Sequence, residues 1–237
     1  MKLYKTLICL IFAAPILLIY SCAPLYVPNA INAPLMSNKG EIHANLSAGS
    51  NGFDLMTSGA VTDHFAIMAN GEYQNRDNVD SNSTDLRQHT FGEVGFGYYT
   101  KLNEKARFEV FGGGGYGTAA SYMKNAGVKF RAQGEYYRLF LQPNIGMSSD
   151  VFDGAFSMRL GYVRLFNFNK DYADLSLSPS TFLIEPAATI RVGYKYVKFF
   201  FQVGASFKTD KNFYSETWNP IFFNLGAHLT FGKKWEI

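Results

Sequence analysis

Three stretches near the end of the chain alternate apolar and polar side chains with a period of two, and this pattern constrains the fold more than any other feature. The stretches are 182–195, 197–208 and 220–231. In the second, the apolar positions are Val197, Phe199, Phe201, Val203, Ala205 and Phe207. A two-residue period is typical of β-strands with one apolar face, and no stretch after residue 37 has the apolar spacing of an amphipathic helix. The pattern predicts an all-β fold.

The same reasoning places ten strands along the chain. They are expected at 39–49, 52–62, 64–76, 87–102, 105–122, 134–149, 154–168, 180–195, 197–208 and 219–232. Short turns alternate with longer polar segments at 77–86, 123–133, 169–179 and 209–218. Transmembrane barrels alternate short periplasmic turns with long extracellular loops, so the pattern predicts an antiparallel up-and-down β-barrel. Eight strands is the alternative count, because the tight turn Ser50-Asn51-Gly52 stands where a long loop is expected.

The polar face of these strands is unlike that of a water-exposed sheet. It carries glycines, small polar residues and isolated charges, and only 17% of the chain is charged. Its glycines are Gly95, Gly97, Gly113, Gly115, Gly146, Gly161, Gly193, Gly204 and Gly226. Small residues suit a crowded barrel interior, whereas a soluble lipocalin-like barrel points long charged side chains outward. The faces favour a transmembrane barrel, and a soluble lipocalin-like lipoprotein that binds a small apolar ligand is the alternative.

Strand parity predicts which ionisable side chains face inward. The acidic ones are Glu41, Asp54, Glu72, Glu93, Glu109 and Glu185, and the basic ones are Arg107, Arg138, Arg159, Arg191 and Lys198. Charges held away from water need partners, and these two sets are almost balanced. We therefore expect ion pairs and hydrogen bonds across a filled polar lumen, and no open pore.

The first 21 residues have the features of a secretory signal peptide. Lys2 and Lys5 precede an apolar run from Leu7 to Ile19, which is too short for a helix across a bilayer core of about 30 Å. The run ends in Leu18-Ile19-Tyr20-Ser21-Cys22, which resembles the lipobox of bacterial lipoproteins. The resemblance implies cleavage before Cys22 and lipidation of that residue. Cleavage after Ala23 is the alternative.

The remaining chain divides into a periplasmic amino-terminal linker, 22–38, and a barrel, 39–237. Cys9 lies within the signal peptide, so Cys22 is the only cysteine beyond it and an intramolecular disulfide is excluded.

Several stretches after the lipobox resemble small outer-membrane β-barrel proteins of Gram-negative bacteria. They are CAPLYVPNAINAPLMSNKGEIHANLSAGSNGFDLMTSGAVTDHFAIMANGEY, EPAATIRVGYKYVKFFFQVGASF and FFNLGAHLTFGKK. The resemblance implies an outer-membrane location, with the lipid anchor on the periplasmic side, and a structural or interaction role through the extracellular loops. Its motifs are architectural, so no catalytic or binding residue is carried over from it.

Composition narrows the expected partners. Setting aside Lys2 and Lys5 leaves 20 basic residues against 19 acidic ones, so the basic footprint of a nucleic-acid-binding protein is absent. The expected partners are outer-membrane lipids, with lipopolysaccharide or envelope proteins as further candidates. No cofactor is expected, and the residues specify no small-molecule ligand.

The four histidines are the main candidates for chemistry. His43 and His228 lie on the first and last strands, which meet when a barrel closes, but a metal site needs three or four ligands and only Glu41 is an obvious third. We expect satisfied lumen histidines and no metal. His64 falls at a turn.

His89 carries the enzymatic alternative. It begins a predicted strand beside the loop that contains Asp77, Asp80, Ser81, Ser83 and Asp85, and a barrel hydrolase acting on lipid or peptide would use such groups. Loops are also polar because they are wet, so we expect a protein that is not an enzyme and has no catalytic residues.

Glycines and aromatic residues have structural interpretations. The run from Phe111 to Gly117 superficially resembles a phosphate-binding loop, but strand-like sequence follows it, and close packing in a barrel wall is the better interpretation. Seven tyrosines fall toward strand ends, where barrels carry interfacial aromatic girdles. They are Tyr98, Tyr99, Tyr136, Tyr137, Tyr162, Tyr194 and Tyr196.

Overall fold

The computed structural model describes residues 25–79, 83–125, 128–170, 180–210 and 220–232, and within them every regular element is a strand. The strands are β1 (Ile42–Gly49), β2 (Gly52–Ala60), β3 (Phe65–Val79), β4 (Ser83–Lys101), β5 (Ala106–Asn125), β6 (Val128–Ser148), β7 (Phe152–Lys170), β8 (Ser180–Tyr194), β9 (Val197–Ala205), β10 (Phe207–Lys208) and β11 (Ile221–Phe231). Across these described ranges, no helix is long and apolar enough to cross a membrane.

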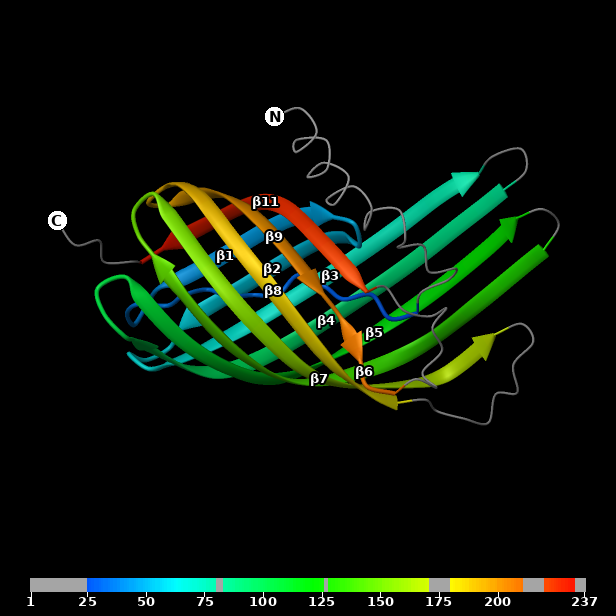
Figure 1. Ribbon diagram of the computed structural model, residues 1–237, viewed down its shortest axis with the longest axis horizontal. Helices are drawn as coiled ribbons and strands as arrows, with labels where there is room; N and C mark the ends of the chain where they lie inside the picture. The colour runs from blue at the N-terminus through cyan, green and yellow to red at the C-terminus, as the bar shows by residue number, and fades with distance from the viewer. Residues whose placement is uncertain (1–24, 80–82, 126–127, 171–179, 211–219, 233–237) are drawn as a thin grey trace, which may run out of the picture.

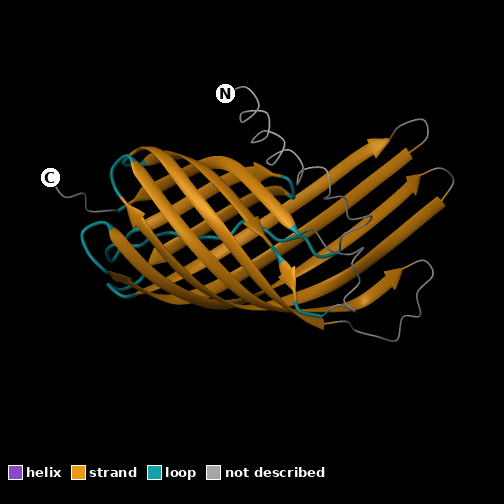
Figure 2. Cartoon of the chain, in the orientation of Figure 1, coloured by secondary structure: helices purple, strands orange, loops and turns teal. Residues whose placement is uncertain are grey.

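Ten of the strands close into an antiparallel barrel (Figures 1 and 2). Each pairs with its neighbour in the chain, and β11 completes the ring between β9 and β1. The closing seam sets Asn45 opposite His228. β10 is an extra two-residue strand after β9 that pairs with β8. The predicted ten-stranded up-and-down barrel is confirmed.

Four strands, β3 to β6, run at least three residues further toward one end of the barrel than predicted. β2 ends its pairing where Phe53 meets Tyr73, but β3 continues to Val79, paired with β4. β5 and β6 likewise pair out to Asn125 and Val128. The polar residues expected to form loops there keep the ladder hydrogen bonds of the hairpins, because strand pairing does not require a buried face. We call the end where these hairpins project the projecting end (Figure 1), and the opposite end, with turns at 61–64, 102–105, 149–151 and 195–196, the short-turn end.

The two faces of the wall have opposite polarity. All eleven ionisable residues predicted to face inward are buried, from Glu41 on β1's approach to Lys198 on β9. The outward positions are apolar and exposed, for example Leu46, Leu55, Ile67, Val94, Phe96, Leu139, Leu160, Ile190, Phe199, Val203, Phe223 and Leu225. The barrel is therefore polar inside and apolar outside, as its alternation predicts.

The largest departure from the sequence analysis is inside the barrel. Every residue from Leu25 to Ser37 is buried, and this stretch, which we call the luminal segment, runs within the barrel as an irregular chain (Figure 2). Residues 25–37, which the sequence analysis assigns to the periplasmic amino-terminal linker 22–38, lie inside the barrel. The physical reason is composition: no charged residue occurs between Cys22 and Lys39, so the stretch can be buried at low cost.

Candidate functional site

The luminal segment crosses the barrel lengthwise, from the projecting end to the short-turn end. Along β6, its partner changes from Arg138 at Asn29 to Gln142 at Asn32. Along β8, the partner changes from Glu185 at Tyr26 to Arg191 at Ala33. Ser37 ends the passage beside Arg107, near the base of β5 (Nε–Oγ 2.9 Å). Each step toward higher numbers is a step toward the short turns.

Lumen side chains take the place of a neighbouring strand for this segment's backbone. Gln202 brackets Ile31, accepting from its N–H and donating to its carbonyl oxygen, both at 2.8 Å. Asp54 accepts from the Ala30 N–H at 3.1 Å and Glu109 from the Met36 N–H at 2.7 Å. Buried backbone groups must be paired, and here the pairing is to side chains on three wall strands, β2, β5 and β9.

Proline explains why the segment does not add a strand to the sheet. Pro28 and Pro34 have no N–H to donate to a ladder. The Pro28 carbonyl oxygen instead accepts from the Asn51 side chain in the β1–β2 turn, at 2.8 Å. The luminal segment therefore occupies the interior of the barrel and does not form a strand of its wall.

Two acids and two bases from the wall form an alternating cluster midway along the barrel, which we call the central network. Arg138 pairs with Glu93, and Arg159 pairs with Glu185 (Nε–Oε2 2.6 Å). Arg159 also lies 3.7 Å from Glu93. All four side chains are buried, so their charges are balanced where water cannot screen them.

The luminal segment supplies the neutral bridges of the central network. The Asn29 Oδ1 accepts from Arg138 at 2.7 Å and from Arg159 at 2.9 Å, while its Nδ2 donates to Glu93 at 3.2 Å. The Tyr26 hydroxyl accepts from Arg138 at 2.8 Å and donates to Glu185 at 2.9 Å. Two uncharged side chains thus contact all four charges.

Leu25, the first residue of the segment, packs against apolar side chains toward the opening of the barrel at its projecting end, which we call the projecting mouth. Leu25 belongs to a buried cluster with Tyr136, Phe91 and Leu183. The Phe91 ring also lies under the Arg138 guanidinium, 4.4 Å from carbon Cζ to the ring centroid. Apolar side chains therefore lie directly between part of the central network and the projecting mouth.

A second ion cluster lies near the short-turn end. The Lys198 Nζ is 2.7 Å from Asp153 Oδ1, and Arg191 is 3.9 Å from the other oxygen of the same carboxylate. Asp153 is buried but was not among the predicted inward residues, because the predicted strand begins one residue later, at 154, whereas β7 begins at Phe152.

His43 and His228 meet at the seam, as the closing strands predict. Their rings are 3.1 Å apart at Nδ1 and Nε2, His43 contacts Glu41 at 2.8 Å, and His228 contacts Asn45 at 2.7 Å. Among the residues that the structure describes, no three His, Cys, Asp or Glu side chains are arranged to hold a metal ion. The pair is a hydrogen-bonded chain across the seam.

Among the candidate hydrolase residues that the structure describes, His89 does not meet Asp77 or Asp85. His89 is buried in the lumen, where it contacts the Tyr136 hydroxyl at 2.8 Å and Glu72 at 3.3 Å. Asp77 is exposed and Asp85 binds Arg87 at 2.8 Å; Asp80 and Ser81 lie outside the described residues, as do the signal peptide and Cys22. The rim position predicted for His89 is therefore wrong, because its parity turns it inward, away from the loop.

The tyrosines divide between the two faces. Tyr98, Tyr137, Tyr162, Tyr194 and Tyr196 lie on the outer face, as predicted for girdles. Tyr99 and Tyr136 are instead buried, and the reason is their place next to an outward tyrosine in the pairs 98–99 and 136–137.

The glycine-rich run is part of a wall strand. Residues 111–117 lie within β5, which confirms the packing interpretation. A Cβ atom on Gly117 would lie 2.8 Å from Phe91 and 2.9 Å from Tyr136, so glycine makes room there for the aromatic layer beneath the mouth.

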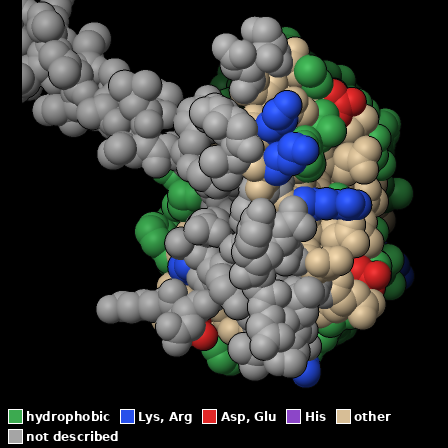
Figure 3. All heavy atoms as spheres, turned by 90° about the vertical axis from the view of Figure 1, so that its right-hand side faces the viewer, with side chains coloured by type: hydrophobic (Ala, Val, Ile, Leu, Met, Phe, Trp, Pro, Cys, Tyr) green, Lys and Arg blue, Asp and Glu red, His purple; other side chains and the backbone are tan. Residues whose placement is uncertain are grey.

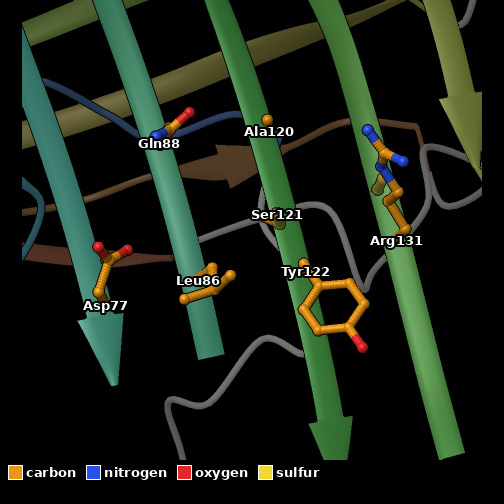
Figure 4. A pocket seen from close by; sticks show the side chains of 8 residues that line it. Asp77, Leu86, Gln88, Ala120, Ser121, Tyr122 and Arg131 are labelled. Carbon is orange, nitrogen blue, oxygen red and sulfur yellow. The ribbon is translucent and has the colours of Figure 1, made fainter. Parts of the chain in front are cut away.

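One pocket lies on the projecting hairpins themselves. It has a volume of about 440 Å³, and Figure 4 shows its lining side chains on β3 to β6. Asp77 and Arg131 stand at its two sides, with Leu86, Gln88 and Tyr122 between them. Seen from the projecting end, several Lys and Arg side chains stand close together (Figure 3). Asp77 and Arg131 offer the pocket one charge of each sign, but its lining specifies no ligand.

In comparisons with known proteins, no family model and no curated protein matches the chain. The luminal segment was the part of the site that the sequence analysis missed, and a signal for it was present. A solvent-exposed linker normally carries charges, and residues 23–38 carry none.

Proposed function

We propose that this chain is a lipid-anchored, integral β-barrel of a Gram-negative outer membrane, closed by its own luminal segment, with a structural or interaction role through its projecting end. The observation that carries the proposal is the polarity of the wall, which is apolar outside and charged inside. In water, a barrel with this polarity would expose its apolar face, whereas a bilayer requires that face.

The aromatic residues of the outer face support a bilayer. Near the projecting end, Tyr137, Tyr162 and Phe182 contact one another in a row, with ring centroids 6.3 and 5.2 Å apart. Near the short-turn end, Phe65 lies 5.8 Å from Tyr98. Aromatic side chains, tyrosine included, near both ends of the outer face are typical of the two interfaces of a membrane-spanning barrel.

The filled lumen argues against the other roles of a barrel. A lipocalin-like carrier needs an apolar cavity, but the described interior holds ion pairs and the luminal segment. A diffusion pore needs a continuous water path, which the same segment occupies. The remaining role is at the surface, where outer-membrane lipids, lipopolysaccharide or other envelope proteins would be the partners.

The test is membrane retention of the Cys22→Ser protein, followed by gel mobility with and without boiling after alkaline extraction. A transmembrane barrel stays in the outer-membrane pellet and shifts in mobility on boiling, because the barrel itself spans the bilayer. A Cys22→Ser protein that is released folded into the soluble fraction would refute the proposal and favour the lipocalin-like alternative.

A further inference from the structure

The direction of the luminal segment decides on which side the chain begins. Leu25 lies in the apolar cluster at the projecting mouth, and Ser37 lies at the short-turn end, where Asn38 contacts the Gly232 carbonyl oxygen. From Leu25 onward, the chain therefore passes through the barrel before β1 starts, and it runs from the projecting end toward the short-turn end.

Chain length leaves the residues before Leu25 no route to the other side. The shortest wall strands, with eight and nine residues, correspond to a wall of roughly 25 Å after tilting. Cys22 precedes Leu25 by three residues, which span at most about 10 Å when fully extended. The lumen is filled by the segment itself, so a return through it is closed as well.

We propose that the mature chain begins on the projecting face, so that an acyl anchor at Cys22 inserts into the same leaflet that the projecting hairpins border. This inference rests on the proposed function and differs from the expectation of an anchor on the periplasmic side. If the projecting end faces outward, the protein is a surface-anchored lipoprotein whose chain crosses its own barrel.

The leaflet is within reach of the anchor. The aromatic cluster around Leu25 includes Tyr136, whose neighbour Tyr137 stands on the outer face in the aromatic row near the projecting end. Leu25 thus lies at about the depth of that interface. An acyl chain attached three residues earlier needs only to pass over the rim to enter the outer leaflet.

The experiment places a short epitope between Ala23 and Pro24 of the full-length protein, which leaves the lipobox and Cys22 unchanged. Antibody binding is compared on intact and on permeabilised cells. Two single-cysteine variants, labelled with a membrane-impermeant maleimide, report the orientation: Asn78→Cys on β3 for the projecting end and Lys105→Cys for the short-turn end, both at exposed positions.

The expected result is epitope binding and Asn78→Cys labelling on intact cells, with Lys105→Cys labelled only after permeabilisation. An epitope that requires permeabilisation while Asn78→Cys does not would overturn the inference and leave the proposed function standing. If Asn78→Cys instead requires permeabilisation, the proposed orientation fails. The passage through the barrel is then still supported when the epitope behaves like Asn78→Cys, and refuted when it behaves like Lys105→Cys.

Discussion

At the scale of single residues, the interior is organised by a few neutral side chains that satisfy charges. Asn29 is the clearest case, since its amide contacts Arg138, Arg159 and Glu93 at once. A buried charge that loses a hydrogen-bond partner retains its desolvation cost, so the neutral bridge matters more than its own size suggests.

We expect Asn29→Leu to lower the free energy of unfolding by about 2 kcal/mol or more, because two arginines lose an acceptor that leucine cannot replace. Urea unfolding in lipid vesicles, followed by gel mobility, measures the change. Asn75→Leu, at an exposed position on β3, is the matched control and should shift the curve by less than about 0.5 kcal/mol. Equal stability of the two variants would show that the central network does not need the bridge.

Glycine packing gives a second prediction at this scale. Gly117→Ala puts a methyl group against Phe91 and Tyr136, whereas a Cβ at Gly92 has nothing within 4 Å. We expect Gly117→Ala to cost about 1–3 kcal/mol, as overpacking does, and Gly92→Ala to cost much less. The same urea unfolding compares them, and a Gly92→Ala variant that is destabilised as strongly would contradict the packing argument.

At the scale of elements, the wall strands were predictable from the sequence and the luminal segment was not. Strands such as β8, β9 and β11 alternate apolar outward and mostly polar inward side chains, so a period of two marks them directly. The same parity identified the eleven buried ionisable residues. Asp153 and His89 follow the same parity and are buried as well, but the predicted strand bounds leave Asp153 in a turn and place His89 at a strand end beside a loop.

The luminal segment has no period because its surroundings change at every residue. Its side chains meet apolar, amide and charged partners in turn, from Leu25 at the mouth to Ser37 beside Arg107. Such a stretch is defined by tertiary contacts with residues distant in the sequence, some more than a hundred positions away, as the bond between Tyr26 and Glu185 illustrates. Only its lack of charge distinguishes it from an ordinary linker.

Thiol protection tests the position of this segment. In a Cys22→Ser background, Ile31→Cys should resist maleimide until the barrel is unfolded, because Ile31 is completely buried. Lys39→Cys, which is exposed two residues after the segment ends, should react at once. Similar labelling rates in folded protein would place the segment outside the barrel.

At the scale of the whole molecule, the barrel wall and the luminal segment have distinct roles. The wall provides the apolar outer face and the charged lining, and the segment occupies the remaining space. A ten-stranded barrel is near the size at which side chains alone can fill the interior. Here a stretch of backbone contributes as well.

We expect deletion of residues 25–37 to convert the closed barrel into a narrow ion-conducting channel, since the lining that remains is polar and charged. Planar-bilayer recording measures the discrete conductance steps, and the full-length protein, which should show none, is the control. A variant that retains its heat-modifiable mobility but does not conduct would mean that wall side chains close the lumen without the segment.

The course of the chain from Leu25 to Ser37 means that the barrel closes around a segment of its own chain, which is threaded through the lumen. The luminal segment continues into β1 within a few residues, and β1 pairs with β11. The barrel is therefore completed by the last strand that the structure describes. An acyl group at Cys22, before the luminal segment, would be too large to pass through a packed lumen. This would constrain the order of assembly. The luminal segment would have to be in place before β1 pairs with β11, and afterwards the segment and the wall could not separate unless that pairing opened.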